Sequence, residues 1–321
     1  EISSEGLIEY QGKPINKFYV EGLDLMEGQY GMISQNLSAD KVSSVEVIEN
    51  HQPIKSLEDI EPSDQAAINI KLKNNITVTG NATVGGGVSP GLWYVNAVPM
   101  VFLKDMQALI SYQTNNTGED LNRGFTRFSM RSFRYGQRSD SRQNWLSTAN
   151  TSAPSFATKR WLDNTTHLGS INLLLKDKKD TEFRIKTSYL NDFRKREGGI
   201  KTTYLLPDGD IVIDDNTYHH SQAEKFETTL SVERNEKDDF FKNELTFAKQ
   251  WDGSYARVLQ NADLKEHRLH NPFTNITNNL ERLFSFGTEL LTLNSNIGYN
   301  ETPQNLTLTP GVFEEILSNN N

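Results

Sequence analysis

The segment TEFRIKTSYLNDF, residues 181–193, alternates apolar and polar side chains over most of its length. Phe183, Ile185 and Tyr189 fall on one side of an extended chain. Arg184 and Lys186 fall on the other side. A period of two residues is typical of a β-strand with one apolar and one polar face. The segment therefore predicts a strand whose two faces meet different surroundings.

The same alternation recurs in residues 226–234, 242–251 and 291–299, and short charged turns at 176–180 and 235–239 separate successive runs. These signals predict antiparallel strands that follow one another in sequence order. One continuous apolar surface is expected to contain Phe183, Ile185, Tyr189, Leu230, Val232, Leu245, Phe247, Leu291 and Leu293. The opposite surface is expected to contain Arg184, Lys186, Glu227, Glu233, Glu244 and Asn294.

The length of these runs favours a transmembrane barrel over a soluble β-sandwich. Sandwich strands usually have about five or six residues, whereas a tilted strand needs about 9–11 to cross a bilayer. Long polar stretches at 115–129, 138–160 and 254–279 are expected to be loops at the end opposite the short turns. Aromatic residues near the expected strand ends fit girdles at the membrane interfaces, namely Tyr112, Tyr189, Phe193, Trp251 and Tyr299.

The number of strands is too small for a barrel that holds a plug. At about 25 to 30 residues per strand and connection, residues 75–321 provide about 8 to 10 strands, whereas a plugged lumen needs about 22. The chain is therefore expected to be an internal segment that contains only the first part of a barrel.

Residues 6–73 have a different pattern. Val45 and Val47 alternate around Glu46, and Ile68 and Ile70 alternate around Asn69, which predicts two strands with all four aliphatic side chains in a core. A Ser38 N-cap predicts a short helix over 40–44. Gly12-Lys13-Pro14 predicts a turn between short strands. The region is expected to be a small α+β unit.

The order of these pieces resembles the second half of the plug domain of TonB-dependent outer-membrane receptors, particularly those of Bacteroidetes-type bacteria. The resemblance rests on GLIEYQGKPI (6–15), Val20-Glu21-Gly22, the strand at 45–48 and the strand at 68–70. Two features depart from the family pattern. Glu49-Asn50-His51 stands where the family usually has Lys-Gly-Pro, and no TonB box is present upstream.

The resemblance implies a small α+β plug domain, of which residues 1–74 are the C-terminal part. All-β antiparallel transmembrane barrel strands would follow, with residues 75–321 as the first strands of an incomplete barrel. The implied function is energised uptake of a nutrient (a glycan, a peptide or a metal chelate) across the outer membrane of a Gram-negative bacterium. The implied partners are the lipid bilayer, the TonB complex through a segment outside this chain and, in some relatives, a surface lipoprotein lid. The alternative is a soluble or surface-attached all-β binding or adhesion protein with an N-terminal α+β domain.

Composition narrows the remaining functions. The chain has no cysteine and a net charge of −9, which argues against thiolate metal sites and against nucleic acid as a partner. No nucleophile and base pair stands out, so no enzyme activity and no cofactor are expected. The His267/His270 pair is expected in a loop, and neither it nor the His219-His220 pair is expected to form a metal site. The acidic run at 208–215 is expected to be a turn between strands, with calcium binding in an extracellular loop as the alternative.

Candidate ligand-binding residues lie in the long polar stretches. Aromatic rings can stack on sugars, and guanidinium groups can bind carboxylates. The candidates are Arg134, Tyr135, Arg138, Trp145, Arg160 and Trp161, with bracing of the loops against each other as the competing interpretation.

Overall fold

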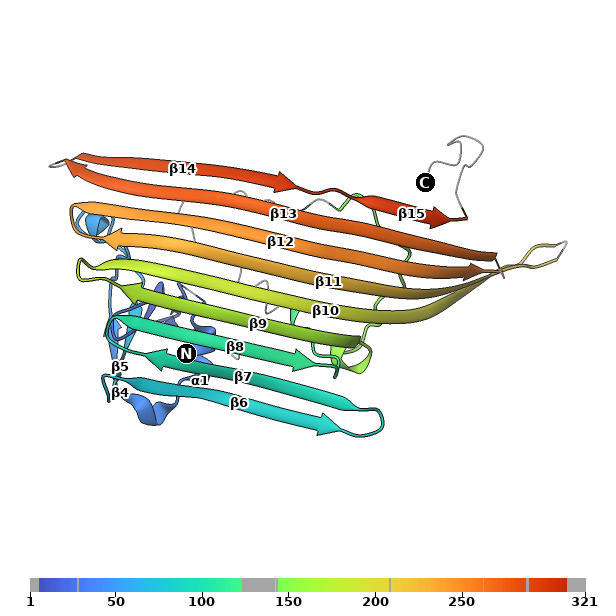
Figure 1. Ribbon diagram of the computed structural model, residues 1–321, viewed down its shortest axis with the longest axis horizontal. Helices are drawn as coiled ribbons and strands as arrows, with labels where there is room; N and C mark the ends of the chain where they lie inside the picture. Colours follow the sequence, from blue (N-terminus) through green and yellow to red (C-terminus); the bar gives the residue numbers. More distant parts are fainter. Residues whose placement is uncertain are drawn as a thin grey trace.

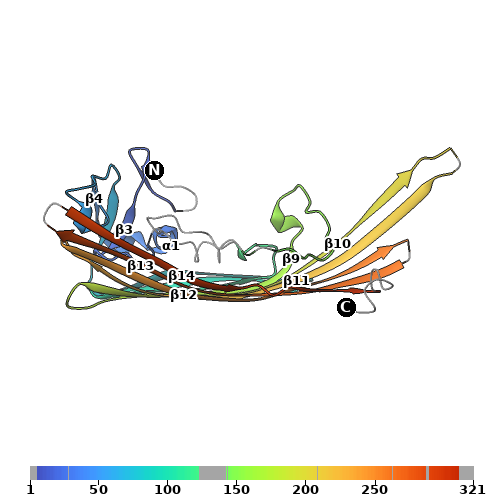
Figure 2. The ribbon, with the colours of Figure 1, turned by 90° about the horizontal axis from the view of Figure 1, so that it is seen from above.

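The computed structural model describes residues 6–27, 29–122, 142, 144–207, 209–261, 263–286 and 289–310. The chain is mostly β and is dominated by one large, curved antiparallel sheet (Figure 1). A smaller N-terminal region, residues 6–73, lies against the concave face of this sheet near one end of its strands (Figure 2).

The large sheet is a meander in sequence order, from β6 to β14, with β15 paired to β13. Its strands are β6 (Thr77–Gly87), β7 (Leu92–Phe102), β8 (Met106–Asn115), β9 (Asp163–Lys176), β10 (Thr181–Tyr204), β11 (Ile211–Asn235), β12 (Asp239–Gln260), β13 (Asp263–Phe286), β14 (Glu289–Glu301) and β15 (Asn305–Thr309). The predicted antiparallel order is confirmed. Within the described ranges β6 and β14 do not pair, so the sheet is open.

Two predictions about this sheet are wrong. The stretch 254–279 is not a loop, because β12 and β13 run through it and pair from Asp239↔Phe284 to Gln260↔Asp263. The backbone hydrogen bonds between β12 and β13 stabilise these strands although the stretch has few apolar side chains. The expected positions of Tyr189, Phe193 and Trp251 near strand ends are also wrong, because β10 and β12 continue well beyond these residues.

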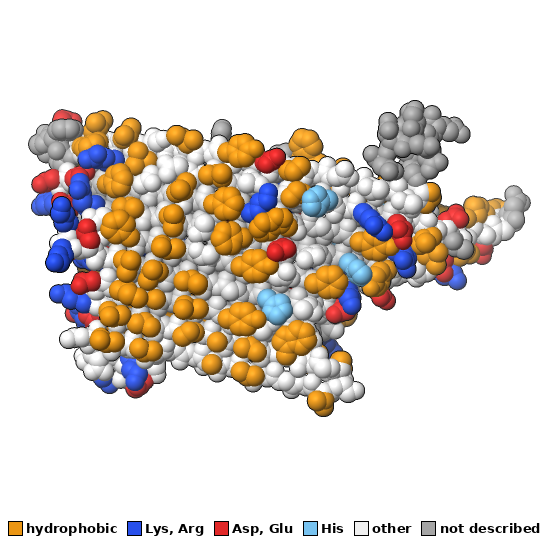
Figure 3. Space-filling model, viewed as in Figure 1, with side chains coloured by type: hydrophobic (Ala, Val, Ile, Leu, Met, Phe, Trp, Pro, Cys, Tyr) orange, Lys and Arg blue, Asp and Glu red, His pale blue; other side chains and the backbone are white. Residues whose placement is uncertain are grey.

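The register separates the side chains into two faces, as predicted. One cross-strand row on the outer face consists of Val78, Val101, Ala108, Leu173, Ile185, Leu230, Leu245, Asn278 and Ile297. Hydrophobic side chains are spread over this face, and charged side chains gather at the edge that carries the short turns (Figure 3). The inner, concave face carries Arg184, Lys186, Glu233 and Glu244, on the opposite side of their strands from this row.

The N-terminal region contains a three-stranded mixed sheet in the order β3-β5-β4, in which β3 runs parallel to β5 and β4 runs antiparallel to it. Its elements are β1 (Glu9–Tyr10), β2 (Lys13–Pro14), β3 (Lys17–Val20), α1 (Gly31–Asn36), η1 (Ala39–Lys41), β4 (Val42–Ile48), η2 (Lys55–Leu57) and β5 (Ala67–Leu72). The turn between β1 and β2 is Gln11-Gly12, where both residues have positive φ angles of 51° and 76°. The predicted helix over 40–44 is wrong, because that segment is a single 3-10 turn followed by β4, while the α-helix is α1.

The predicted core is half correct. Ile68 and Ile70 are buried, with 8% and 7% of their surfaces exposed. Val45 and Val47 are 56% and 43% exposed. They share a face with the two isoleucines, because Val47 pairs with Ile68 and Val45 with Ile70. However, β4 is the edge strand of the small sheet, and the core reaches it at Val42 but does not cover Val45 and Val47.

One hydrophobic cluster joins the N-terminal region to the large sheet. Phe18, Leu25 and Ile33 of the N-terminal region are buried in the same cluster as Met100 and Leu109 of the inner face. The ring of Phe18 also stacks on the ring of Tyr30, with 5.1 Å between centroids. The apolar part of the contact therefore involves β7 and β8, near the edge of the sheet that is formed by β6. None of the helices in the described residues combines the length and the apolar character needed to cross a membrane.

Candidate functional site

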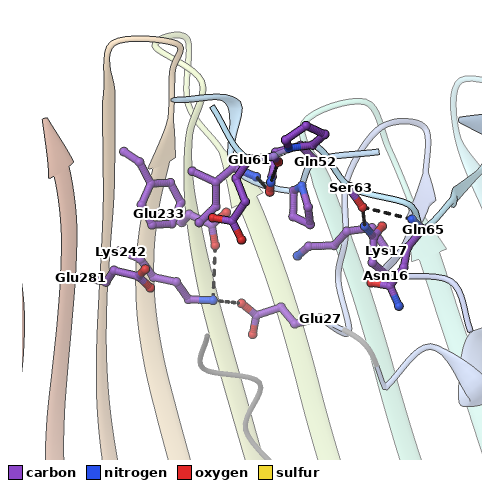
Figure 4. A pocket seen from close by; sticks show the side chains of 14 residues that line it. Asn16, Lys17, Glu27, Gln52, Glu61, Ser63, Gln65, Glu233, Lys242 and Glu281 are labelled. Atoms are coloured by element: carbon purple, nitrogen blue, oxygen red, sulfur yellow. Dashed lines mark hydrogen bonds and ion pairs between the residues drawn. The ribbon is translucent and has the colours of Figure 1, made fainter. Parts of the chain in front are cut away.

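Charged side chains of the inner face meet the N-terminal region beyond the apolar cluster. Lys186 on β10 and Lys242 on β12 both point towards Glu27, which follows β3 by seven residues in the chain. Their ammonium nitrogens lie 2.5 Å and 2.6 Å from the two carboxylate oxygens of Glu27. Figure 4 shows Glu27 reaching towards Lys242 from the opposite side of the site. One carboxylate thus connects two strands of the large sheet to the N-terminal region.

Arg184 extends this network along β10. Its Nη1 lies 3.1 Å from Glu233 Oε2 and 3.8 Å from Glu27 Oε1. Its Nε donates a hydrogen bond to the backbone carbonyl of Asp24 at 3.2 Å. The Asp24 carboxylate in turn pairs with Lys17 at 2.8 Å. The contact is therefore a chain of alternating charges that crosses from one region to the other.

These ion pairs change the proton affinity of the groups involved. Burial disfavours the charged form of Glu27, but the positive charges of Lys186, Lys242 and Arg184 outweigh it and hold the pKa of Glu27 well below its usual value. Burial likewise disfavours the charged form of Lys17, yet Asp24 and two glutamates raise the pKa of Lys17 above its usual value. Both groups therefore stay charged at neutral pH, and the contact remains ionic.

His51 lies in the same contact but stays neutral. Burial, with a smaller contribution from the charge of Lys17, lowers the pKa of His51 to about 4. Its Nδ1 lies 2.9 Å from Asn16 Oδ1, and its Nε2 lies 3.2 Å from Tyr19 Oη. A neutral ring with a proton on Nδ1 can donate to Asn16 and accept from Tyr19.

A cleft of about 490 Å³ lies between the N-terminal region and the inner face (Figure 4). Its walls are formed by polar and charged residues around four apolar ones, Pro53, Ile54, Pro62 and Phe240. The charged residues that line it are Lys17, Glu27, Glu61, Glu233, Lys242 and Glu281. The cleft shows that the two regions do not form a continuous dry core at this level.

The short turn between β11 and β12, at the end of these strands, forms hydrogen bonds with the N-terminal region. Asn235 donates to the carbonyl of Pro53 at 2.7 Å and accepts from the N–H of Lys55 at 2.9 Å. Ser56 donates to the carbonyl of Glu236 at 2.8 Å. These bonds fix the η2 segment against the turn.

Three of the six predicted ligand-binding residues fall in the part of the chain that the structure describes. Arg134, Tyr135 and Arg138 lie outside the described residues. Trp145 is 81% exposed, and Arg160 ends the exposed turn η3 (Thr158–Arg160). Ligand binding by these residues stays a prediction.

Of the described candidates, Trp161 lines a cleft of about 580 Å³ between residues 151–163 and β10. The guanidinium of Arg196 lies over the Trp161 ring, 4.7 Å from its centroid. Sequence reasoning missed Arg196 and the following Gly198-Gly199, although a charged run that ends in two glycines is unusual inside a strand.

The histidine and acidic motifs do not form a metal site in the described part of the chain, where no cluster of three or more possible ligands occurs. His267 and His270 are on β13, so the predicted loop is wrong, and three residues along a strand place their side chains on opposite faces. His219 accepts or donates at Thr148 Oγ1, 3.2 Å away, and braces the segment 144–162 on the inner face.

Comparison with known proteins does not assign the chain to a family. No model of a known protein family matches it, and no curated protein matches it.

Proposed function

We propose that this chain is a segment of a TonB-dependent outer-membrane receptor that imports a nutrient. In this proposal β6 to β14 cross the outer membrane of a Gram-negative bacterium, and residues 6–73 are the C-terminal part of a plug domain that occupies the lumen. The bilayer and the TonB complex are the proposed partners, with a surface lipoprotein lid as a further partner. The observation that carries the proposal is that the large sheet turns its apolar side chains outwards and its charged side chains inwards, onto its concave face.

The outer face has the dimensions and side chains suited to a bilayer. Between the Phe183 level and the Thr187 level, the cross-strand rows of the outer face contain no charged residue. An aromatic level of three successive rows adjoins this region on the same face, with Tyr299 on the Thr187 row, Tyr112, Tyr189 and Phe226 on the next row, and Trp251 on the row after that. From Phe183 to Tyr189 the strand rises about 20 Å, which at a tilt of about 40° spans about 15 Å, so the charge-free rows fit within the apolar band of about 25 Å of outer-membrane barrels.

Three charged residues, Glu224, Lys249 and Glu301, share the aromatic level, and the first two are hydrogen-bonded to neighbours on the sheet. Glu224 accepts from Tyr189 Oη at 2.7 Å, and Lys249 donates to Thr274 Oγ1 at 2.5 Å. Charged side chains at this level fit a membrane interface, where long side chains can reach water.

The contact between the N-terminal region and the inner face supports a movable gate. It combines an apolar cluster near β7 and β8 with ion pairs and a polar cleft near β10 to β13. Polar groups can exchange their partners for water when the two surfaces separate, whereas a dry apolar contact cannot. Such a contact seals the lumen and still separates under a pulling force.

The alternative, a soluble or surface-attached all-β binding or adhesion protein, would need to cover or tolerate the apolar outer face. Large contiguous apolar patches are rare on soluble monomers. The deciding experiment expresses the native protein and separates membranes from soluble material. We expect the protein to pellet with membranes, to resist extraction by salt and alkali, and to be released by detergent with heat-modifiable gel mobility. Recovery of folded protein from the soluble fraction without detergent would reject the proposal.

A further inference from the structure

The edge of β10 is open over its second half. β9 pairs with β10 only as far as Asp163↔Lys195, whereas β10 continues to Tyr204 and pairs with β11 throughout. Among the described residues, the backbone of 196–204 makes no hydrogen bond to a segment other than β11. In an antiparallel strand every second residue points its N–H and C=O to the same edge. Residues 196–204 therefore present a row of backbone donors and acceptors, which is a template for an added strand.

The cleft of about 580 Å³ lies along this edge. One wall is formed by residues 195–200 of β10, and the other by residues 151–154 with Trp161 and Asp163. Its volume falls within the range of about 300–1,000 Å³ that is usual for ligand sites. The β10–β11 hairpin continues beyond the cleft and projects from the rest of the sheet (Figure 2).

Two polar atoms of the cleft residues are buried without a hydrogen-bond partner, namely Trp161 Nε1 and Thr151 Oγ1. Buried polar groups in native proteins are nearly always paired, so an unpaired indole N–H indicates a missing acceptor. A peptide carbonyl is an acceptor of the required kind.

The backbone at the edge is accessible. Gly198 and Gly199 are exposed and carry no side chain that would keep a second strand away. Thr151 lies so close to Gly198 that a Cβ there would approach its Cγ2 to 2.9 Å. The glycine thus also sets the distance between the two walls.

The charges of the cleft favour a peptide over a glycan. Arg196 and Lys195 bring positive charge, and Asp163 and Glu197 bring negative charge, so both signs of a zwitterionic ligand meet a counter-charge. The guanidinium of Arg196 already covers one face of the Trp161 ring, which reduces the surface on which a sugar could stack. An unpaired backbone edge recognises another backbone rather than hydroxyl groups.

We propose that the free edge of β10, residues 196–204, binds an extended peptide by strand addition, with the cleft beside Trp161 receiving part of that peptide. The proposal rests on the proposed receptor function, for which it names peptides as the class of nutrient.

The test uses the full chain in detergent and a tryptic digest of casein as the probe. Retained peptides are separated from free peptides by ultrafiltration and identified by mass spectrometry, and the strongest one is synthesised for titration. We expect Trp161→Phe, which keeps an aromatic side chain but removes the indole N–H, to bind this peptide about tenfold more weakly, as the loss of one buried hydrogen bond predicts. The control Trp251→Phe changes a tryptophan of the outer face and should bind as the wild type does.

A second probe tests strand addition without changing the protein. The same peptide with N-methyl groups on alternate backbone nitrogens loses the donors that an edge strand needs, and we expect one of the two alternating patterns to abolish binding. Equal binding of both methylated peptides, equal binding by Trp161→Phe, or retention of maltoheptaose in place of peptides would each overturn the proposal. Flotation of the same preparation with liposomes separates the two claims. Flotation without peptide retention rejects only the peptide site, whereas failure to float rejects the proposed membrane location.

Discussion

The N-terminal region and the large sheet use the same alternation of apolar and polar residues in opposite senses. In the N-terminal region Phe18 and Val20 alternate with polar neighbours and point into a buried core. In the large sheet Ile185 and Leu230 alternate with polar neighbours and point outwards, where they are 40% and 47% exposed. Arg184, which precedes Ile185 on β10, is only 3% exposed and faces inwards. A period of two residues therefore fixes a strand but not the direction in which its apolar face points.

The difference is set by what lies on each side of the strand. Side chains of β3 and β5 meet α1 and the first strands of the large sheet, so they gain from leaving water. The outer face of the large sheet meets no other described element, while its inner face meets charged groups of the N-terminal region. If the outer face meets lipid, both regions follow the same rule, because each apolar face contacts an apolar medium.

The largest effect is expected in the core of the N-terminal region. Phe18→Ala removes a ring that is 3% exposed and stacked on Tyr30, so it should destabilise the region by about 3–5 kcal/mol. The matched control is Val47→Ala on the exposed edge strand, which should change stability by less than about 0.5 kcal/mol. Hydrogen exchange of β3 and β5 under increasing denaturant measures both. Equal effects of the two substitutions would place β4 inside the core.

The next prediction compares the cost of placing a charge on the outer face and on the inner face of one strand, β11. Leu230→Arg places a charge in the middle of the apolar row and should destabilise the protein in liposomes by about 2–4 kcal/mol. Thr229→Arg, one residue away on the inner face, should cost no more than about 1 kcal/mol, because that face is polar. Urea unfolding in liposomes compares them. A larger cost at position 229 than at position 230 would contradict the proposed membrane contact.

The ionic contact between the two regions should respond to loss of a single charge. Glu27→Gln leaves Lys186 and Lys242 without their shared carboxylate and should weaken the contact by about 2–3 kcal/mol. Asp64→Asn is the control, because its pair with Lys13 is exposed and surface ion pairs contribute little. Protease sensitivity of residues 6–73 at increasing urea reports the contact. An unchanged profile for Glu27→Gln would show that the apolar cluster alone holds the regions together.

The smallest effect is a pH dependence from His51. Its pKa is lowered to about 4 in the folded chain, against about 6.5 in an unfolded one. The unfolded state therefore binds the proton first, and stability should fall as the pH drops from about 6.5 to about 4. Lys17 and Asp24 are the charged groups that act on the ring, and Glu27 adds a loss in the same direction at lower pH.

The comparison of His51→Gln with the wild type isolates this contribution. Between pH 7 and pH 4.5 the unfolding midpoint of the variant should decrease less than that of the wild type. A parallel decrease in both proteins would assign the acid sensitivity to other groups.

The sequence by itself determined the strands, their antiparallel order and the division of side chains between two faces. Phe183, Ile185 and Leu230 were correctly assigned to one surface because alternation is a local property of an extended chain. Local signals failed in the polar stretch 254–279, where backbone hydrogen bonds between β12 and β13 form strands despite the polar composition. They also failed at Val45 and Val47, because β4 is an edge strand and these side chains stay exposed. The 3-10 turn at Ala39–Lys41 also shows that an N-cap residue indicates a helical turn without fixing its length.

Only the tertiary structure decided which residues meet across the fold. Glu27 reaches Lys186 and Lys242, which are more than 150 positions away, and no pattern in the sequence connects them. The cleft between Trp161 and Arg196 likewise depends on where β9 begins and on how residues 151–163 lie on the inner face. Local side-chain periodicity is set by backbone geometry, whereas these contacts depend on the register and curvature of the whole sheet. They are therefore properties of the folded chain that its local sequence does not contain.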